Sequence, residues 1–376
     1  MVTGHIRKRA TKSGKVSYQI ILETERDPIT GQRQRFYETV NGTKKEAEKR
    51  LNQRIHELSN GASIVKTSAV KLKDWMHEWL SLYTAQLAET TRAGYRQQIE
   101  YRINPYLGDY PLNLITSKDI QAWVNTLSND DGLSGQTVKN IFLNLQAAMK
   151  QAKKLKMIAE NPCEDIILPR IEKYEAQVYD VPQIQEALKL AEGTDMYLLM
   201  FLEFMLGLRK GEIAGLMWSD IDFQKGVIHI QRSRVKVDGR VITKAPKSKA
   251  GIRDLWPGTH TMLVLSQEYQ KYLDKAQSPK FKATGYVICK EDGTPFVPDS
   301  IAQKWDRFKV AHNLPDIRFH DLRHTCATTM IAHGVDTKTV QTRLGHSDVH
   351  VTLNTYSHCL PSMNQAAGET MDLILK

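Results

Sequence analysis

Five short segments in the second half of the 376-residue chain carry side chains that could bind an anion, move a proton or act as a nucleophile. In chain order they are Gly207-Leu208-Arg209-Lys210-Gly211-Glu212-Ile213, Lys247-Ser248-Lys249-Ala250-Gly251, His320-Asp321-Leu322-Arg323-His324, Leu344-Gly345-His346 and Thr355-Tyr356-Ser357-His358. Arginines hold phosphate oxygens through forked, permanently charged hydrogen bonds. Lysine and histidine can move a proton, and tyrosine can act as a nucleophile. Each segment alone is weak evidence, because single charged residues usually face solvent.

The local sequence predicts where these segments lie. Arg209 closes an apolar helix and opens another, at a junction where a helix N-terminus could also point at an anion. Lys249 lies between two strand-like stretches, which predicts the tip of a β-hairpin. On a helix, His320 and Arg323 share one face. A different row is expected to point inward, and it consists of Leu322, Cys326 and Met330.

The ordered set resembles the tyrosine recombinases, the phage-integrase family. An arginine, a lysine, His-x-x-Arg, Gly-His and a tyrosine occur in the family's order and spacing, with Tyr356 ten residues after His346. The resemblance implies the catalytic residues Arg209, Lys249, His320, Arg323, His346 and Tyr356, with Glu212 as the acidic partner of Arg209. It extends over nearly the whole chain, and its N-terminal part is the least specific.

This resemblance implies a metal-free and ATP-free reaction that needs no cofactor. The two arginines would clamp the non-bridging oxygens of the scissile phosphate. Tyr356, whose ordinary pKa is ~10, would attack the phosphorus after His320 or His346 has accepted its proton. Lys249 would protonate the departing 5′-oxygen. The product would be a 3′-phosphotyrosyl enzyme, which a 5′-hydroxyl of another duplex can reopen, so that a mobile element is integrated or excised.

One local departure from the family pattern affects the lysine. The family often ends this strand with Arg-x-Ile-Pro, whereas this chain has Arg253-Asp254-Leu255-Trp256-Pro257. The offset leaves the general acid open between Lys249 and Lys247. Lys249 is favoured because Ser-Lys-x-Gly would lie at the tip.

The elements that must position these residues predict a mainly α protein with small β-sheets, an α+β fold of three domains. Residues 1–60 are basic and predict a small sheet and one helix, which resembles an arm-site DNA-binding domain. Residues 70–160 show helical periodicity and predict a bundle that resembles the family's core-site-binding domain. Within it, Thr90 or Thr91 is expected to cap a helix that stops near Asn104-Pro105. Residues 175–376 would form the mixed α/β catalytic domain.

Composition and charge agree with a protein that acts on DNA. The chain holds 52 basic and 42 acidic residues, for a net charge of +10, which indicates a polyanionic partner. Its 4 cysteines lack CxxC spacing, no apolar run is long enough to span a membrane, and no secretory signal is apparent, so a cytoplasmic protein is expected. The family resemblance implies a bacterial host and association with its nucleoid.

The expected partners are double-stranded DNA at core and arm attachment sites, other copies of the chain and accessory proteins. The resemblance implies a homotetramer on DNA, in which the tail Leu360 to Lys376 docks on a neighbouring copy. Whether the element is a phage or a conjugative transposon stays open. A basic run near the end of the bundle could face phosphates or solvent, and it consists of Lys150, Lys153, Lys154 and Lys156.

Three other classes of function remain alternatives. His320 and His324, four residues apart, superficially match a zinc-binding helix, but Asp321 replaces the glutamate of H-E-x-x-H and Arg323 would lie beside the metal. A non-catalytic DNA-binding protein would not need every catalytic position to be filled. A type IB topoisomerase would use the same chemistry on one duplex, whereas the basic N-terminal segment favours recombination between two sites.

Overall fold

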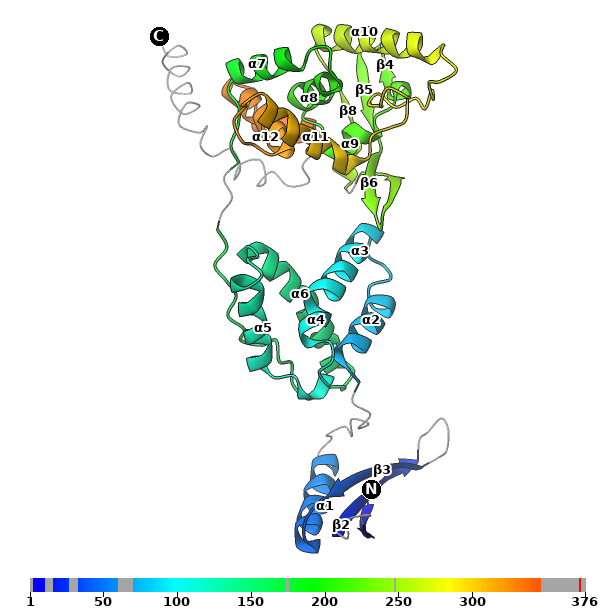
Figure 1. Ribbon diagram of the computed structural model, residues 1–376, viewed down its shortest axis with the longest axis vertical. Coiled ribbons are helices and arrows are strands. Elements are labelled where there is room, and N and C mark those ends of the chain that lie inside the picture. Colours follow the sequence, from blue (N-terminus) through cyan, green and yellow to red (C-terminus); the bar gives the residue numbers. More distant parts are fainter. Residues whose placement is uncertain are drawn as a thin grey trace. The chain divides into compact units, whose positions relative to one another are not determined.

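The computed structural model describes residues 3–10, 16–26, 33–59, 70–172, 176–246, 248–345 and 372, which belong to two compact units, Met1–Glu172 and Lys173–Lys376 (Figure 1). Helices predominate, and the strands form small antiparallel sheets. The predicted fold class is therefore confirmed. The boundary at residues 61–69 stays a prediction, because 60–69 lie outside the described residues.

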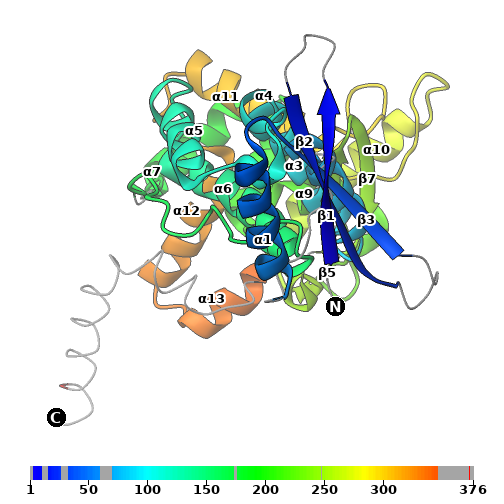
Figure 2. The ribbon, with the colours of Figure 1, turned by 90° about the horizontal axis from the view of Figure 1, so that it is seen from below.

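The chain begins with a three-stranded sheet and one helix. The strands β1 (Thr3–Ala10), β2 (Val16–Arg26) and β3 (Arg33–Val40) pair with β2 in the centre, and α1 (Lys44–Ser59) packs on β1 and β2 (Figure 2). The sequence Thr43-Lys44-Lys45-Glu46 predicts a capping box, and it forms: the Thr43 amide donates to Glu46 Oε2 at 2.7 Å and the Glu46 amide donates to Thr43 Oγ1 at 3.4 Å. In β1, three successive basic residues (Arg7 to Arg9) obscure the alternation that would mark a strand in the sequence.

Helices make up the rest of the first unit. They are α2 (Leu72–Leu82), α3 (Glu89–Gln98), the π-helical turn η1 (Ile99–Ile103), α4 (Asn104–Leu107), the 3-10 turn η2 (Leu112–Leu114), α5 (Ser117–Asn129) and α6 (Gly135–Lys154). The predicted Trp and Met stripe, Trp75, Met76 and Trp79, is buried in their shared core. The indole of Trp75 donates to the carbonyl of Ala148 at 3.1 Å, which ties α2 to α6.

Three predicted boundaries in this bundle are wrong. α3 begins after Ala88 without a side-chain cap, so Thr90 and Thr91 lie in its first turn. The chain stays helical past Pro105 through η1 and α4, because a proline in a first helical turn has no amide hydrogen bond to lose. The helical periodicity from Ser134 predicts a helix to about Ile158, whereas α6 ends at Lys154. The basic run after its middle is exposed at Lys150, Lys153, Lys154 and Lys156.

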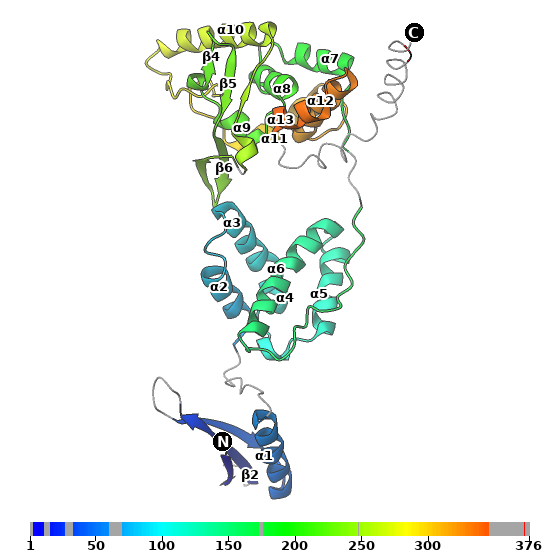
Figure 3. The ribbon, with the colours of Figure 1, turned by 180° about the vertical axis from the view of Figure 1, so that it is seen from behind.

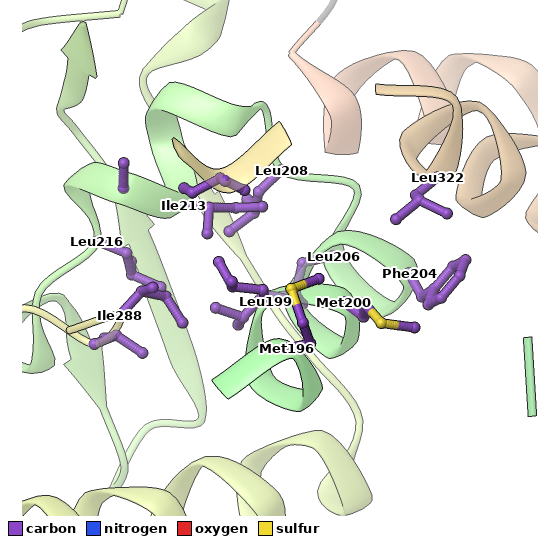
Figure 4. Close-up of a cluster of buried hydrophobic side chains, with 14 of the residues drawn as sticks. Met196, Leu199, Met200, Phe204, Leu206, Leu208, Ile213, Leu216, Ile288 and Leu322 are labelled. Carbon is purple, nitrogen blue, oxygen red and sulfur yellow. The ribbon is translucent and has the colours of Figure 1, made fainter. Parts of the chain in front are cut away.

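The second unit packs its helices around α8. Its helices are α7 (Val181–Ala191), α8 (Asp195–Leu206), α9 (Lys210–Gly215), α10 (Thr259–Ala276), α11 (Pro298–Ala311), α12 (Phe319–Ala332) and α13 (Thr337–Leu344), with 3-10 turns η3 (Trp218–Asp220) and η4 (Lys249–Gly251). Met196, Leu199 and Met200 of α8 lie in the apolar core beside Leu206, Ile213 and Leu322 (Figure 4). α8 also packs on α12, so the core brings together the segments that carry Arg209 and Arg323.

Two small sheets complete this unit. β4 (Ile221–Asp222), β5 (Val227–Ile230) and β8 (Arg253–Leu255) pair in the order β4-β5-β8, while β6 (Ser233–Val237) pairs with β7 (Arg240–Lys244). The stretch from Val235 to Ile242 is not one strand, since Asp238 and Gly239, with φ of 47° and 79°, form the tight turn between β6 and β7. None of the helices in the described part of the chain is long and apolar enough to cross a lipid bilayer.

Candidate active site

Arg209 lies between α8 and α9, held by the acidic residue predicted to be its partner. Gly207 ends α8 with a φ of 60°, a left-handed conformation that glycine adopts without strain. Arg209 is the N-cap of α9, and its Nη1 donates to Glu212 Oε1 at 2.7 Å. The Arg209 side chain is 37% exposed, whereas that of Glu212 is 2% exposed. The buried carboxylate therefore orients the Arg209 guanidinium, which stays accessible from solvent.

A second arginine, Arg253, shares the same carboxylate. Arg253 Nη2 donates to Glu212 Oε2 at 3.0 Å, and the Arg253 side chain is 5% exposed. Burial alone would raise the pKa of Glu212, but the charges of Arg253 and Arg209 and their hydrogen bonds hold it below its usual range. Glu212 is thus a buried carboxylate that stays charged between two arginines.

Arg323 on α12 is buried, with 1% of its surface exposed. Its Nη1 donates to the carbonyl of Gly207, and its Nη2 donates to the carbonyl of Leu344 at 2.6 Å. The expectation that the inward row is separate from the row of His320 and Arg323 is therefore wrong for Arg323, which is as buried as Leu322. A charged side chain can occupy this position because backbone carbonyls accept its hydrogen bonds.

The C-terminal end of α13 collects all three arginines. α13 packs against α12 (Figure 3). The carbonyls of Arg343, Leu344 and Gly345 accept hydrogen bonds from Arg253 Nε at 2.6 Å, Arg323 Nη2 at 2.6 Å and Arg209 Nη2 at 2.7 Å, respectively. The last carbonyls of a helix have no partner within the helix and carry partial negative charge. Here the guanidinium groups of Arg209, Arg253 and Arg323 donate hydrogen bonds to these carbonyls and form a single cluster.

Lys249 lies in the 3-10 turn η4, which precedes β8, and its side chain is exposed. The predicted hairpin tip is wrong, because β7 pairs with β6 and β8 pairs with β5. The turn nevertheless lies beside the arginine cluster: a Cβ added to Gly345 would be 2.6 Å from the carbonyl oxygen of Ala250 and 3.1 Å from Arg253 Nη1. Lys247, the alternative, lies outside the described residues.

His320 and His324 face each other on the first turns of α12, with ring centroids 5.3 Å apart in an edge-on arrangement. Part of the His320 ring is exposed. Burial of the rest, followed by the charge of Arg323, lowers the pKa of His320 to about 4. Burial likewise lowers the pKa of His324. His320 is therefore neutral near pH 7 and able to accept a proton.

Glu203 is a buried carboxyl group behind the cluster. It lies on α8, is 0% exposed, and neither side-chain oxygen has a hydrogen-bond partner. Burial raises its pKa well above the usual range, and the carboxylates of Asp321 and Glu212 act in the same direction, against Arg323 and Lys210. Asp321 is also fully buried, and it accepts from Arg318 Nη2 at 2.9 Å.

The structure thus brings together Arg209, Glu212, Arg323 and the turn that carries Lys249. His346 and Tyr356 lie outside the described residues, as does the tail predicted to dock on a neighbour. Sequence reasoning missed Arg253 and Glu203 as members of this cluster. The signal for Arg253 was present in the Arg-x-Ile-Pro comparison, and the signal for Glu203 was a single acid within the apolar helix.

Potential metal ligands do not gather in this region. Among residues 3–345 that the structure describes, no group of at least three His, Cys, Asp or Glu side chains is placed to hold a metal ion. The cysteines within these ranges, Cys163, Cys289 and Cys326, are free thiols. Within the described ranges, the zinc alternative has only the His320 and His324 pair as its support.

Comparison with known proteins gives a consistent result. Residues 177–363 match the phage integrase family, and residues 71–128 match the phage integrase N-terminal SAM-like domain. A tyrosine recombinase XerC-like protein of Caldanaerobacter subterraneus subsp. tengcongensis is 30% identical, over 96% of this chain and 97% of that protein.

Two solved structures share the fold. The integrase of transposon Tn1549, in complex with transposon right end DNA, has a TM-score of 0.68 at 20% identity, covering 80% of this chain and 99% of that one. A lambda integrase tetramer bound to a Holliday junction has a TM-score of 0.60 at 20% identity, covering 91% of this chain and 95% of that one.

Proposed function

Because the chain belongs to the phage integrase family of tyrosine recombinases, enzymes that cut and rejoin DNA at specific sites, we propose that its arginine cluster binds the scissile phosphate. Arg209 is the accessible member and would meet a non-bridging oxygen first. Arg323 would hold the second oxygen by exchanging one of its carbonyl partners for the phosphate. Each guanidinium contact is stronger with the additional negative charge of the transition state than with the ground state, which is the basis of catalysis here.

The remaining groups supply the nucleophile and the two proton transfers. Tyr356 Oη attacks the phosphorus, and its proton passes to neutral His320 or to His346. The bond between phosphorus and the 5′-oxygen breaks, and Lys249 gives that oxygen a proton. The 3′-phosphotyrosyl ester formed is then opened by a 5′-hydroxyl from the partner duplex. Glu212 stays charged and keeps Arg209 oriented throughout.

One observation supports this assignment most directly. Three consecutive carbonyls at the end of α13 accept hydrogen bonds from Arg209, Arg253 and Arg323. The last of these carbonyls belongs to Gly345, which precedes His346 in the chain. Residues far apart in the sequence therefore converge on one point, next to the segment that continues to Tyr356. A cluster of positive charge suits an anionic substrate.

We further propose that residues 70–376 bind and cut core DNA, that residues 1–60 bind arm sites, and that the working form is a homotetramer on DNA. The net charge of +10, the exposed basic strand β1 and the tetrameric lambda neighbour support these roles. The tail after Leu360 would pack on a neighbouring copy. Accessory proteins that bend DNA are compatible with separate core and arm sites. These roles would place the enzyme with the bacterial chromosome in the cytoplasm.

The nucleophile can be tested with a nicked suicide substrate that carries the crossover core. Tyr356→Phe should bind this DNA as the unaltered chain does and form no covalent complex, because the ring without its hydroxyl cannot attack phosphorus. Tyr286→Phe is a matched control, since Tyr286 lies under Arg234, with the guanidinium carbon 4.7 Å from the ring centroid, and serves packing. A covalent adduct with Tyr356→Phe would refute the assignment.

A further inference from the structure

Arg253 uses all three nitrogens of its guanidinium group inside the protein. Nε donates to the Arg343 carbonyl at 2.6 Å, Nη1 to the Gly251 carbonyl at 3.1 Å, and Nη2 to Glu212 Oε2 at 3.0 Å. Its side chain is 5% exposed and is held by a carboxylate and two backbone carbonyls. We therefore look for its function in the groups that it contacts.

Those contacts join the turn of Lys249 to the rest of the site. Gly251 is the last residue of η4, and the Gly251 amide donates to the Ser248 carbonyl at 2.9 Å, which closes the turn. Arg253 itself is fixed in β8, where it pairs with Ile230 of β5. Its side chain therefore reaches back from a sheet and holds the carbonyl of the preceding turn.

The opposite side of this turn is held by Gly345. Its φ of 67° is left-handed, and a Cβ at this position would lie only 2.6 Å from the Ala250 carbonyl oxygen, so the two backbones are in close contact. Arg253 and Gly345 thus confine η4 from two directions. Gly345 is also the residue whose carbonyl accepts from Arg209. The turn η4 and the arginine proposed to bind phosphate therefore both contact Gly345.

We infer that Arg253 is a positioning residue that places the turn carrying the general acid against the scissile phosphate. The inference rests on the proposed role of Lys249. A lysine on a flexible stem reaches the 5′-oxygen only if its backbone is fixed, and a displacement of about 1 Å can cost roughly 100-fold in rate. Arg253 donates no proton and binds no DNA in this scheme; it fixes Lys249 relative to Arg209.

A substrate in which sulfur replaces the bridging 5′-oxygen separates positioning of the acid from general structural damage. A thiolate leaves without protonation, since thiols ionise near ~8.5. Lys249→Ala should slow single-turnover cleavage of ordinary core DNA by about 10²- to 10⁴-fold, and come within about tenfold of the unaltered chain on the sulfur-bridged duplex.

Arg253→Lys is the decisive variant. Lysine keeps the charge beside Glu212 but cannot reach the Gly251 and Arg343 carbonyls together. We expect a loss of roughly 100-fold on ordinary DNA and recovery on the sulfur-bridged duplex. The double variant Arg253→Lys/Lys249→Ala should be no slower than Lys249→Ala, because the two residues act in one step. An equal loss on both substrates, or an additive loss in the double variant, overturns the inference.

Arg234→Lys supplies the matched control. Arg234 is also a buried arginine, and its Nη1 donates to the Phe296 carbonyl at 3.0 Å and to the Ala214 carbonyl of α9 at 3.4 Å. It should lower the melting temperature without a cleavage defect that sulfur repairs. If Lys249→Ala is not rescued while Lys247→Ala is, the proposed acid is wrong, and rescue of Arg253→Lys still supports positioning of the turn. If Lys249→Ala is rescued and Arg253→Lys is not, only the inference fails.

Discussion

Arg209 Nη2 donates to the carbonyl oxygen of Gly345 at 2.7 Å, across 136 positions of sequence. Arg209 begins α9, and Gly345 is the left-handed residue that ends α13. The contact ties Arg209, the first arginine proposed to bind the phosphate, to the residue that precedes His346 in the chain. It also predicts that the guanidinium fork, and not charge alone, matters at this position.

Arg209→Lys and Arg323→Lys test this point. Each keeps the positive charge but loses the planar fork that contacts a carbonyl and a second acceptor together. Cleavage of core DNA should fall by about 10²- to 10³-fold, the usual loss for a transition-state donor, while affinity for the DNA changes little. Single-turnover cleavage and a binding titration measure the two effects. Arg307→Lys, on α11, is the control, and unaltered rates in both variants would contradict the clamp.

Glu203→Gln tests the buried carboxyl group on α8. The folded-state pKa of Glu203 is raised above its ordinary 4.5, so its contribution to stability is complete below pH 4.5 and is lost as the pH rises toward the folded pKa. Glutamine does not titrate. The stability of Glu203→Gln relative to the unaltered chain should therefore increase from pH 4.5 upward. The difference in the free energy of unfolding should grow by at most about 1.4 kcal/mol per pH unit, and it is seen as a rising difference in melting temperature.

The exposed Glu186→Gln on α7 should show no such increase. Parallel melting curves for Glu203→Gln and the unaltered chain from pH 5 to 8 would mean that the carboxyl group is ionised in the folded protein. A buffer series with calorimetric detection decides between the two outcomes.

His320→Gln tests the histidine at the start of α12. The pKa of His320 is lowered from 6.5 to about 4 in the folded protein. Its contribution to stability is therefore complete above pH 6.5 and is lost as the pH falls toward 4, where the folded state resists protonation. The variant should gain stability relative to the unaltered chain as the pH drops through this window. A constant difference between pH 7 and 4.5 would refute the lowered pKa.

A chain that begins near Ser68 tests the role of residues 1–60. It should still cleave core DNA and lose affinity for flanking arm DNA, because β1 to α1 contain the exposed basic residues proposed to bind there. Both kinds of binding should weaken steeply with salt, since phosphate contacts release counterions. Electrophoretic mobility shifts with separate core and arm duplexes measure this. Equal arm binding by both chains would assign the segment another role.

Local chemistry was readable from the sequence, and long-range pairing was not. The capping box of Thr43 and Glu46 follows from two residues three positions apart. The junction between two helices at Arg209 likewise follows from the residues around it. The strand partners of the Lys249 segment depend on β5 pairing with β8 across an inserted β6–β7 hairpin, which no local pattern encodes. The result was a hairpin tip predicted where a 3-10 turn exists.

The arginine cluster shows the same limit. Arg209 and Arg323 were expected to meet, because the family resemblance puts both on one phosphate. The convergence of their hydrogen bonds on consecutive carbonyls of α13, with Arg253 as a third donor, depends on how α8, α12 and α13 pack. Burial of Arg323 could not be inferred either, because periodicity treats a charged residue as solvent-facing.

The shared end of α13 has a consequence for timing. Arg209, Arg253 and Arg323 all donate to carbonyls of Arg343, Leu344 and Gly345, so a shift of this eight-residue helix changes all three hydrogen bonds at once. The chain that leaves Gly345 leads to Tyr356 eleven residues later. Displacement of Gly345 would therefore be transmitted to Arg209, Arg253 and Arg323, two of which are proposed to hold the phosphate. Under the proposed function, movement of the segment that carries Tyr356 and the state of the phosphate site would be coupled through Gly345.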